Sequence, residues 1–374
     1  MKIKVMSVFG TRPEAVKMLP LVKRICAAPG LESIVCITAQ HREMLDQVLR
    51  TFEVTPDYDL NLMTPRQTLT DITTRVLTGM EEVLEKAQPD IVLVHGDTTT
   101  SFSAALAAFY KQIPVGHVEA GLRTGNMYSP FPEEANRSLT GRLATFHFAP
   151  TELNRANLAR ENITRGVYVT GNTVIDALLS IVRDGYAFDD ETLRTMTFGN
   201  ERTILMTAHR RENLGQPMRN IFSAVLEVVN EYEDLRLIYP MHKNPAVREP
   251  AEEILGNHPR IHLIEPIGVG DMHNLFAKCY MILTDSGGIQ EEAPALGKPV
   301  LVLRTETERP EAVETGVVRV VGVERENVAR EIRLLLDSPE AYAKMSNAKN
   351  PYGDGHASER ICDAILEAFA GKRI

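Results

Sequence analysis

Short, almost wholly apolar runs alternate with amphipathic segments of helix length from one end of this chain to the other. Runs with so few polar residues are typical of strands that are buried on both faces, as in a parallel sheet covered by helices. The repeated alternation of strand and helix predicts a doubly wound α/β architecture. The strand-like runs lie at residues 3–9, 33–38, 91–95, 115–119, 146–149, 203–207, 236–239, 262–264, 281–284, 300–303 and 318–321.

The length of 374 residues exceeds what one ordinary hydrophobic core serves, so we expect two domains. The pattern predicts one doubly wound domain over residues 1–172 and a second over 173–354, with a connecting helix near 174–182. A Gly-, Asp- and Pro-rich stretch then precedes a last helix, at about 355–374, which we expect to cross back onto the first domain. Because ligands bind beyond the carboxyl ends of strands in such sheets, we expect an active site in the cleft between the domains.

Composition narrows the class of protein. The formal net charge of −9 and the pI near 5.7 argue against a binder of nucleic acid or of anionic membranes. The four cysteines have no metal-ligand spacing, and we expect them to be packed free thiols. No apolar stretch approaches the roughly 18 residues of a membrane span, and no signal-peptide pattern opens the chain, so we expect a cytoplasmic enzyme.

Two absences narrow the chemistry further. The chain has neither a G-x-x-x-x-G-K-[ST] loop nor a G-x-G-x-x-G fingerprint, which removes most support for ATP hydrolysis and nicotinamide chemistry. No His, Asp and Glu spacing indicates a metal site. We therefore expect an enzyme that uses no cofactor and no metal.

The turn after the first strand is the first candidate anion site. Gly10 permits a tight turn and Pro13 suits the first turn of a helix. The exposed N–H groups of that turn, together with Arg12 and Lys17, would bind anionic oxygen. The alternative is an ordinary turn with two solvated cations.

A second candidate phosphate site follows the strand at 281–284. There Ser286, Gly287 and Gly288 form a turn that leads into a helix, which is a suitable architecture for a pyrophosphate. Glu292 lies one helical turn further along, where its carboxylate could accept both hydroxyls of a ribose. A plain helix cap by Ser286 is the alternative.

Three acidic residues follow strands or loops of the first half. Asp97 comes after the strand at 91–95, Glu119 ends the strand at 115–119, and Glu133 opens a helix. Singly, each is more often a cap or half of a salt bridge, such as Glu133 with Arg137. Three carboxylates converging at one sheet edge would raise one another's pKa values toward those of useful acids and bases.

Two histidines follow strands of the second half. His209 stands beside two arginines and is a candidate anion ligand or acid–base group, and His242 follows the next strand. His95, His117 and His147 lie within apolar strands, where we expect them to be packed and hydrogen-bonded.

Taken together, these strings resemble the non-hydrolysing UDP-N-acetylglucosamine 2-epimerases over nearly the whole chain. The resemblance implies a glycosyltransferase-B type fold, with two Rossmann-like domains around a deep cleft. The matching stretches are residues 10–17, 95–101 (HGDTTTS), 117–124 (HVEAGLRT), 132–137 (PEEANR), 209–213 (HRREN), 285–292 (DSGGIQEE) and 307–311 (TERPE).

The resemblance implies reversible conversion of UDP-N-acetylglucosamine to UDP-N-acetylmannosamine, which supplies a sugar for cell-envelope polysaccharide. In this family, UDP is eliminated to give 2-acetamidoglucal and is then added back, with the proton returned to the other face of C2. The resemblance assigns the catalytic roles to Asp97, Glu119, Glu133 and His209, without deciding which carboxylate is the base. It assigns contacts with UDP to Arg12, Lys17, Met272, Ser286, Gly287, Gly288, Glu292 and Arg309, with Met272 standing where relatives often carry an aromatic residue.

Bacterial members of the family also have a second UDP-N-acetylglucosamine site that activates the enzyme. The resemblance maps this site onto Gln40, Glu43, Arg66 and His242, with Glu43 standing where a glutamine is expected. UDP-N-acetylglucosamine is thus the expected partner as substrate and activator, and a homodimer is the expected assembly.

Three other functions are compatible with parts of the pattern. The nearest is a 2-epimerase that acts on a UDP-diacetamido-uronic acid, or one that releases free N-acetylmannosamine by hydrolysis. A glycosyltransferase shares the fold but needs an acceptor and has no use for bases around C2. A non-catalytic nucleotide-sugar-binding module would leave the carboxylates without a purpose.

Overall fold

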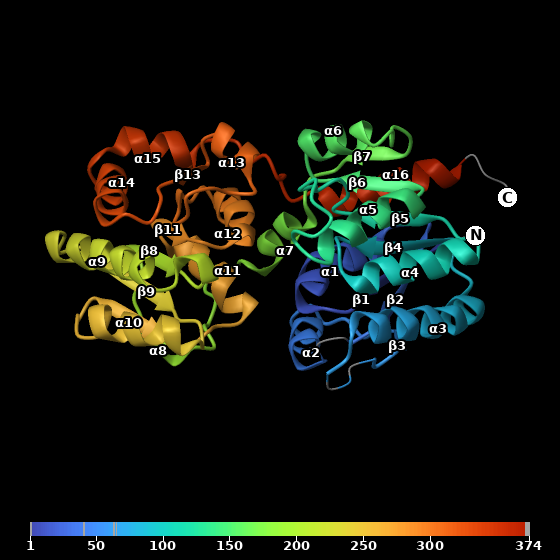
Figure 1. Cartoon of the computed structure of the whole chain (residues 1–374), viewed down its shortest axis with the longest axis horizontal. Coiled ribbons are helices and arrows are strands. Elements are labelled where there is room, and N and C mark those ends of the chain that lie inside the picture. Colours follow the sequence, from blue (N-terminus) through green and yellow to red (C-terminus); the bar gives the residue numbers. More distant parts are fainter. Residues whose placement is uncertain (1, 40–41, 63, 65, 371–374) are drawn as a thin grey trace. The chain divides into compact units, whose positions relative to one another are not determined.

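The computed structural model describes residues 2–39, 42–62, 64 and 66–370, with the side chains of 42–44 outside this description. The chain divides into two compact units. The first runs up to Leu179 and includes the stretch from Tyr352 onward, whereas the second is Ser180–Pro351. Each unit has its own parallel sheet with helices on both faces (Figure 1).

The sheet of the first unit has seven parallel strands in the order β3-β2-β1-β4-β5-β6-β7. Strands β2 and β3 are therefore added on one side of β1, whereas β4 to β7 are added in order on its other side. The point where β1 lies beside β4, with Val8 opposite Val94, is the topological switch point. The strands are β1 (Ile3–Phe9), β2 (Leu31–Ile37), β3 (Tyr58–Asp59), β4 (Ile91–His95), β5 (Val115–Val118), β6 (Phe146–Ala149) and β7 (Val167–Val169).

Helix α1 shows how the sequence directs the turn at this switch point. Thr11 caps the helix and its side chain accepts from the N–H of Glu14, whose carboxylate in turn accepts the N–H of Thr11, so both halves of a capping box are present. The helices of this unit are α1 (Arg12–Ala27), α2 (Arg42–Thr51), α3 (Leu69–Ala87), α4 (Thr99–Tyr110), α5 (Glu133–Leu143), α6 (Glu152–Arg160), α7 (Thr173–Ile181), which crosses the boundary of the unit, and α16 (Ala357–Ala370).

The C-terminal helix α16 packs on α1 within the first unit. Arg24 donates to Glu359 at 2.7 Å, and the rings of Phe146 and Phe369 lie 6.4 Å apart. The carboxylate of Asp176 accepts the N–H groups of Ala357 and Ser358, which fixes the start of α16. In Figure 1 this last helix accordingly lies among elements of the first unit.

The second unit repeats the topology, with six parallel strands in the order β10-β9-β8-β11-β12-β13. Its switch point lies between β8 and β11, where Thr207 is opposite Thr284. The strands are β8 (Arg202–Thr207), β9 (Leu235–Pro240), β10 (Ile261–Ile264), β11 (Met281–Thr284), β12 (Val300–Val302) and β13 (Val318–Val320). The helices are α8 (Glu191–Thr195), η1 (Arg211–Asn213), α9 (Gln216–Glu231), α10 (Pro245–Leu255), α11 (Val269–Lys278), α12 (Gly287–Glu292), η2 (Ala293–Leu296), α13 (Pro310–Glu314), α14 (Arg325–Asp337) and α15 (Pro339–Ser346).

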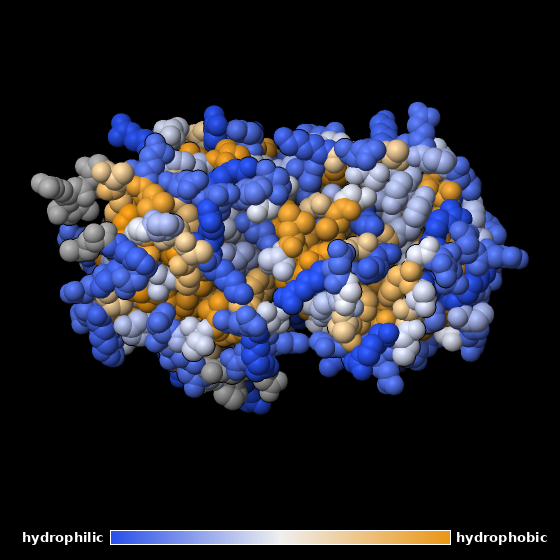
Figure 2. Space-filling model, turned by 180° about the vertical axis from the view of Figure 1, so that it is seen from behind, coloured by the Kyte–Doolittle hydropathy of each residue, from blue (hydrophilic) through white to orange (hydrophobic). Residues whose placement is uncertain are grey.

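Both sheets are buried as the apolar runs predicted, and the predicted α/β class is confirmed. Side chains of the central strands, such as Val8, Val94 and Leu283, are fully buried. Figure 2 shows a mainly hydrophilic surface on which apolar residues gather in patches on each unit. Among the residues that the structure describes, no helix is long and apolar enough to cross a membrane.

The structure differs from the predicted elements mainly at the sheet edges. Strands β3 and β7 carried no recognisable apolar run, because they are two and three residues long and none of their side chains is fully buried. The thiol of Cys26 is exposed rather than packed, whereas Cys36, Cys279 and Cys362 are buried as expected.

Gly10, at the first switch point, has no room for a side chain, so its substitution tests how closely this region is packed. A Cβ atom placed on Gly10 would lie 2.0 Å from Oγ1 of Thr38 and 2.9 Å from Oγ1 of Thr100. Gly10→Ala should therefore lower the free energy of unfolding by about 1–3 kcal/mol, as overpacking of a close-packed interior does. Chemical denaturation measures the loss, and Thr38→Ala provides the background in which the nearest clash is absent. An equal penalty with and without Thr38 would contradict this explanation.

Candidate active site

Glu119 follows β5 and is partly buried. Its side chain accepts hydrogen bonds from Nζ of Lys17, on α1, and from Nδ2 of Asn172 at 2.9 Å. Nε2 of His95 lies 3.7 Å from the other carboxylate oxygen. Side chains from α1, from β4 and from the segment before α7 therefore converge on one carboxylate.

The backbone at Glu119 is unusual as well. Its φ of 63° lies in the left-handed region, which is uncommon for a residue with a side chain. Gly96, at the end of β4, also has a φ of 63°, and a Cβ there would approach Oε2 of Glu119 to 3.3 Å. A side chain at position 96 would crowd Glu119 and strain the backbone, so a glycine is favoured there.

The neighbours of Glu119 decide its charge state. Burial by itself raises the pKa of this carboxylate, but the charge of Lys17 and the hydrogen bonds of Lys17 and Asn172 outweigh burial and hold the pKa well below its usual range. Burial also lowers the pKa of His95, although Glu119 acts in the opposite sense. Glu119 is therefore held ionised beside a cation.

Asp97 follows β4 and is perturbed in the other direction. Arg137, on α5, donates to its carboxylate at 2.5 Å, and Nδ2 of Asn136 donates to its backbone oxygen at 2.9 Å. Burial nevertheless raises the pKa of Asp97 above its usual value, with Arg137 opposing the rise and Glu119 adding to it. The first unit thus holds two carboxylates whose environments push their pKa values apart, an arrangement typical of acid–base sites.

Glu133 is the first residue of α5, and Pro132 precedes it without a side-chain cap. The expected alternative, in which Glu133 pairs with Arg137, is wrong: Arg137 bonds Asp97 and lies 3.4 Å from Glu134. Glu134 and Arg137 are both buried, and Glu134 also accepts the N–H groups of Thr124 and Gly125. Glu133 therefore has no part in that ion-pair chain.

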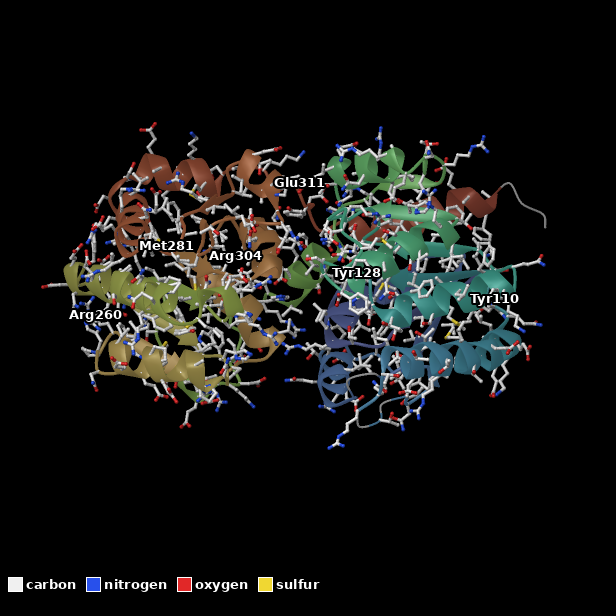
Figure 3. The ribbon with its side chains drawn as sticks, viewed as in Figure 1. Tyr110, Tyr128, Arg260, Met281, Arg304 and Glu311 are labelled. Atoms are coloured by element: carbon white, nitrogen blue, oxygen red, sulfur yellow. The ribbon has the colours of Figure 1, made fainter. Side chains whose placement is uncertain are left out.

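The loop fastened by Glu134 carries two exposed aromatic residues. Tyr128 is 82% exposed, and its ring stacks on that of Phe131 at 6.4 Å. Figure 3 shows Tyr128 at the surface, in the loop that precedes α5. This loop therefore leads directly from exposed aromatic rings to Glu133.

The first candidate anion turn is built around Glu14. Its Oε2 accepts the N–H groups of Gly10 and Thr11, and its Oε1 accepts the hydroxyls of Thr98 and Ser101. This single carboxylate ties the turn after β1 to the turn after β4, which carries Asp97. Arg12, at the start of α1, is partly exposed, whereas Lys17 lies one and a half turns further along and bonds Glu119.

In the second unit His209 follows β8 and lies against Asp285, which follows β11. The N–H of His209 donates to Asp285 at 2.7 Å, and Nδ1 of His209 lies 3.4 Å from the other carboxylate oxygen. The ring of His209 stacks on that of His242 at 5.6 Å with an interplanar angle of 11°. The candidate catalytic histidine and one member of the expected regulatory set are therefore neighbours.

The turn formed by Ser286, Gly287 and Gly288 is flanked by two guanidinium groups. A Cβ at Gly287 would lie 3.7 Å from Arg309 and 3.9 Å from Arg210, so little space separates the turn from either group. Ser286 makes no side-chain cap bond to α12, which argues against the plain-cap alternative. The short turn and the two cations make a suitable place for anionic oxygen.

The loop that carries Arg309 is held in place by further ion pairs. Arg309 itself bonds Glu291. Glu308, the residue before Arg309, pairs with Arg304 at 3.2 Å. Figure 3 labels Arg304 within the second unit, after β12.

Two further residues that were expected to contact UDP, Glu292 and Met272, lie near or on α11. Glu292 accepts from Nε2 of His273, on this helix, at 3.0 Å, and Met272, on the same helix, is partly buried. Glu292 is thus already oriented by a histidine.

The sequence did not predict several residues that surround the carboxylates of the first unit and the anion-binding turn of the second. Arg210 stands next to His209 in the sequence, so that adjacency was an available signal. His95, His117 and His147 were expected to be hydrogen-bonded. Nε2 of His117 does bond the backbone oxygen of Gly96, at 2.7 Å, whereas Nε2 of His95 has no hydrogen-bond partner among the described residues. Asn172 had no local signal, because it reaches Glu119 across 53 positions of sequence.

The expected regulatory set is described only in part. Gln40 lies outside the described residues, and Glu43 falls on α2 with its side chain outside them. Arg66 is exposed, with a φ of 58°. Nδ1 of His242 accepts the N–H of Asn244 at 3.1 Å.

Two parallel, doubly wound sheets, each with charged side chains after its central strands, define a glycosyltransferase-B type protein. A glycotransferase of kitacinnamycin shares this fold with a TM-score of 0.66 over 98% of both chains, at 11% identity. The family model described as UDP-N-acetylglucosamine 2-epimerase matches residues 23–366, and the chain belongs to that family.

Two relatives show how close the similarity is. The UDP-N-acetylglucosamine 2-epimerase of Bacillus subtilis is 56% identical over 368 residues, which is 98% of this chain and 95% of that protein. The crystal structure of UDP-GlcNAc 2-epimerase from Neisseria meningitidis bound to UDP-GlcNAc is 51% identical, with a TM-score of 0.84 over 98% of this chain and all of that one.

Lys17→Met tests the electrostatics of the first unit. Without the cation, burial dominates, so the pKa of Glu119 should rise; carbon-13 NMR of the carboxyl carbons during a pH titration measures it. In the wild type, the depressed pKa contributes stability that is present above the ordinary value of 4.5 and is lost as the pH falls through the folded value. The variant should therefore be less stable near neutral pH, and the difference should narrow in acid.

Lys23→Met, which removes an exposed lysine from the same helix, is the matched control. An unchanged Glu119 pKa in Lys17→Met, with the control behaving as wild type, would show that Lys17 does not set the charge of this carboxylate.

Proposed function

We propose that the chain catalyses the reversible epimerisation of UDP-N-acetylglucosamine and UDP-N-acetylmannosamine at C2. Membership of the 2-epimerase family supports the substrate, since relatives over 50% identical carry that name. The observation that best supports the chemistry is the pair Asp97 and Glu119, which follow neighbouring strands and have pKa values shifted in opposite directions.

The proposed reaction begins with anti elimination. A carboxylate takes the proton from C2, the electrons of that C–H bond form the C1–C2 double bond, and the C1–O bond breaks with its electrons moving to the β-phosphate oxygen. The products are 2-acetamidoglucal and UDP. Direct abstraction without elimination would be difficult, because no carbonyl group adjoins C2 to acidify its hydrogen.

The second half of the reaction forms the C2–H and C1–O bonds again, with the new hydrogen on the other face of C2. A protonated group delivers a proton to C2 while the UDP oxygen returns to C1. Asp97, Glu119 and Glu133 are the proposed proton carriers, and the raised pKa of Asp97 suits a group that must hold a proton.

The leaving UDP must be stabilised as it gains charge. We assign this role to Arg12 and Lys17 in the first unit and, in the second, to His209, Arg309 and the turn at residues 286–288. Arg210 joins this set because its guanidinium flanks the same turn as Arg309. Met272 and Glu292 are the proposed contacts of the nucleoside part.

The proposal extends to regulation and assembly. UDP-N-acetylglucosamine would also bind as an activator through Gln40, Glu43, Arg66 and His242, and the protein would work as a homodimer. The product would enter the synthesis of cell-envelope polysaccharide.

Substitution of the four proposed catalytic residues separates catalytic from structural roles. Asp97→Asn, Glu119→Gln, Glu133→Gln and His209→Asn should each lower kcat by about 10²-fold or more, the scale of general acid–base catalysis. Steady-state kinetics measures the fall, and thermal melting shows whether each variant is folded.

Glu32→Gln and His356→Asn are matched controls, because both side chains are exposed. They should retain wild-type turnover. A variant of the first group that melts early but keeps normal turnover per folded molecule would have a structural role instead.

Isotope exchange tests the reaction itself. In D₂O the UDP-N-acetylmannosamine formed should carry deuterium at C2, and label should also enter recovered UDP-N-acetylglucosamine, because the returning proton comes from an acid that exchanges with solvent. NMR measures both, together with traces of UDP and 2-acetamidoglucal that escape.

The rival functions give other outcomes in the same tube. A hydrolysing enzyme would accumulate free N-acetylmannosamine in proportion to UDP, and a glycosyltransferase would leave the C2 hydrogen in place. Epimerisation with full retention of the original hydrogen would reject elimination and re-addition.

A further inference from the structure

Asp285 is a fully buried carboxylate to which neither the family resemblance nor the proposed mechanism gives a role. Its Oδ2 accepts three hydrogen bonds, from the N–H of His209 at 2.7 Å, the N–H of Arg210 at 2.8 Å and Nδ2 of Asn213 at 3.1 Å. These bonds explain how the turn after β8 is held against the end of β11. They use only one of the two carboxylate oxygens.

The second oxygen faces His209. Oδ1 of Asp285 makes no hydrogen bond among the described residues and lies 3.4 Å from Nδ1 of His209. A buried carboxylate oxygen without a donor is costly, and the imidazole nitrogen is the donor placed to satisfy it. Hydrogen bonds of catalytic groups are often long before substrate binds and shorten afterwards.

We propose that Asp285 is a positioning residue that fixes His209 in the tautomer with hydrogen on Nδ1, so that Nε2 faces the leaving phosphate. This rests on the proposed function, in which His209 acts on the UDP group. Nδ1–H donates to Oδ1, which leaves Nε2 to face the UDP group. The arrangement follows the physical logic by which a buried carboxylate orients a catalytic histidine in other enzymes.

The remaining neighbours of His209 support a fixed ring. His242 stacks flat against the imidazole, at 5.6 Å between centroids, and so restricts its rotation. Nδ1 of His242 accepts the N–H of Asn244, so this nitrogen is already used. Arg210 donates from Nε to the backbone oxygen of Asp285 at 3.3 Å, which ties the neighbouring cation to the same residue.

The opposing explanation is that Asp285 only shapes the turn through Oδ2. The two explanations differ in what happens to the ring of His209 when the carboxylate becomes an amide. In Asp285→Asn the amide oxygen can still accept the backbone N–H groups, but the NH₂ group facing Nδ1 is a donor. Nδ1 must then act as an acceptor, and the hydrogen moves to Nε2.

Nitrogen-15 NMR of histidine-labelled protein tests this without any turnover. In the wild type His209 should be in the Nδ1–H tautomer, and in Asp285→Asn it should change to the Nε2–H tautomer. The spectrum of His242 serves as an internal control and should not change. Asn213→Ala is the matched variant. It removes a bond to Oδ2 of Asp285 and one to the backbone oxygen of Leu303 but none to Oδ1, so it should leave the tautomer of His209 as it is.

A wild-type His209 in the Nε2–H tautomer would overturn the proposal even if Asp285→Asn did not fold. So would an unchanged tautomer in a folded Asp285→Asn. The same variant should lower kcat by about 10²-fold or more with little change in KM for UDP-N-acetylglucosamine, the loss expected when an acid–base group is misdirected. Wild-type protein without epimerase activity would reject the proposed function, whereas the NMR result would still decide the role of Asp285.

Discussion

A buried carboxylate that accepts backbone N–H groups holds the switch point of each sheet. In the first unit Glu14 takes the N–H groups of Gly10 and Thr11, and in the second Asp285 takes those of His209 and Arg210. A chain that leaves a buried strand exposes N–H groups that no neighbouring strand can satisfy. One carboxylate satisfies two of them at once, and in doing so it fixes the direction of the side chains that follow.

The two units solve this problem with residues from different places. Glu14 lies in the first turn of α1, directly after the turn whose N–H groups it accepts. The capping box of α1 therefore also holds the switch point. Asp285 comes from the neighbouring strand end, 76 positions after His209. The second solution leaves one carboxylate oxygen turned toward an imidazole, and this difference places Asp285 beside the ring of His209.

Charges buried near the first switch point are tolerated because each has a partner. Lys17 balances Glu119, and Arg137 balances Asp97, so neither carboxylate faces the full cost of leaving water. The balance differs between the two, because the charge and hydrogen bonds of its neighbours, Lys17 first, outweigh burial at Glu119, whereas burial outweighs Arg137 at Asp97. Two carboxylates at adjacent strand ends therefore acquire opposite pKa shifts, which is the property that acid–base chemistry at a single pH requires.

The sequence by itself determined the fold class and the edge at which charged residues gather. Fully apolar runs can be buried only between two layers of helices, and the residues that follow such runs must emerge at one edge of a parallel sheet. That is why Asp97, Glu119 and His209 could be placed after strands, and why the short edge strands β3 and β7, which lack such runs, could not be predicted. Only the tertiary structure decided the partners. Arg137 bonds Asp97 rather than Glu133, Asn172 reaches Glu119, and Asp285 faces His209, because these contacts join residues tens of positions apart and depend on strand order rather than on local pattern.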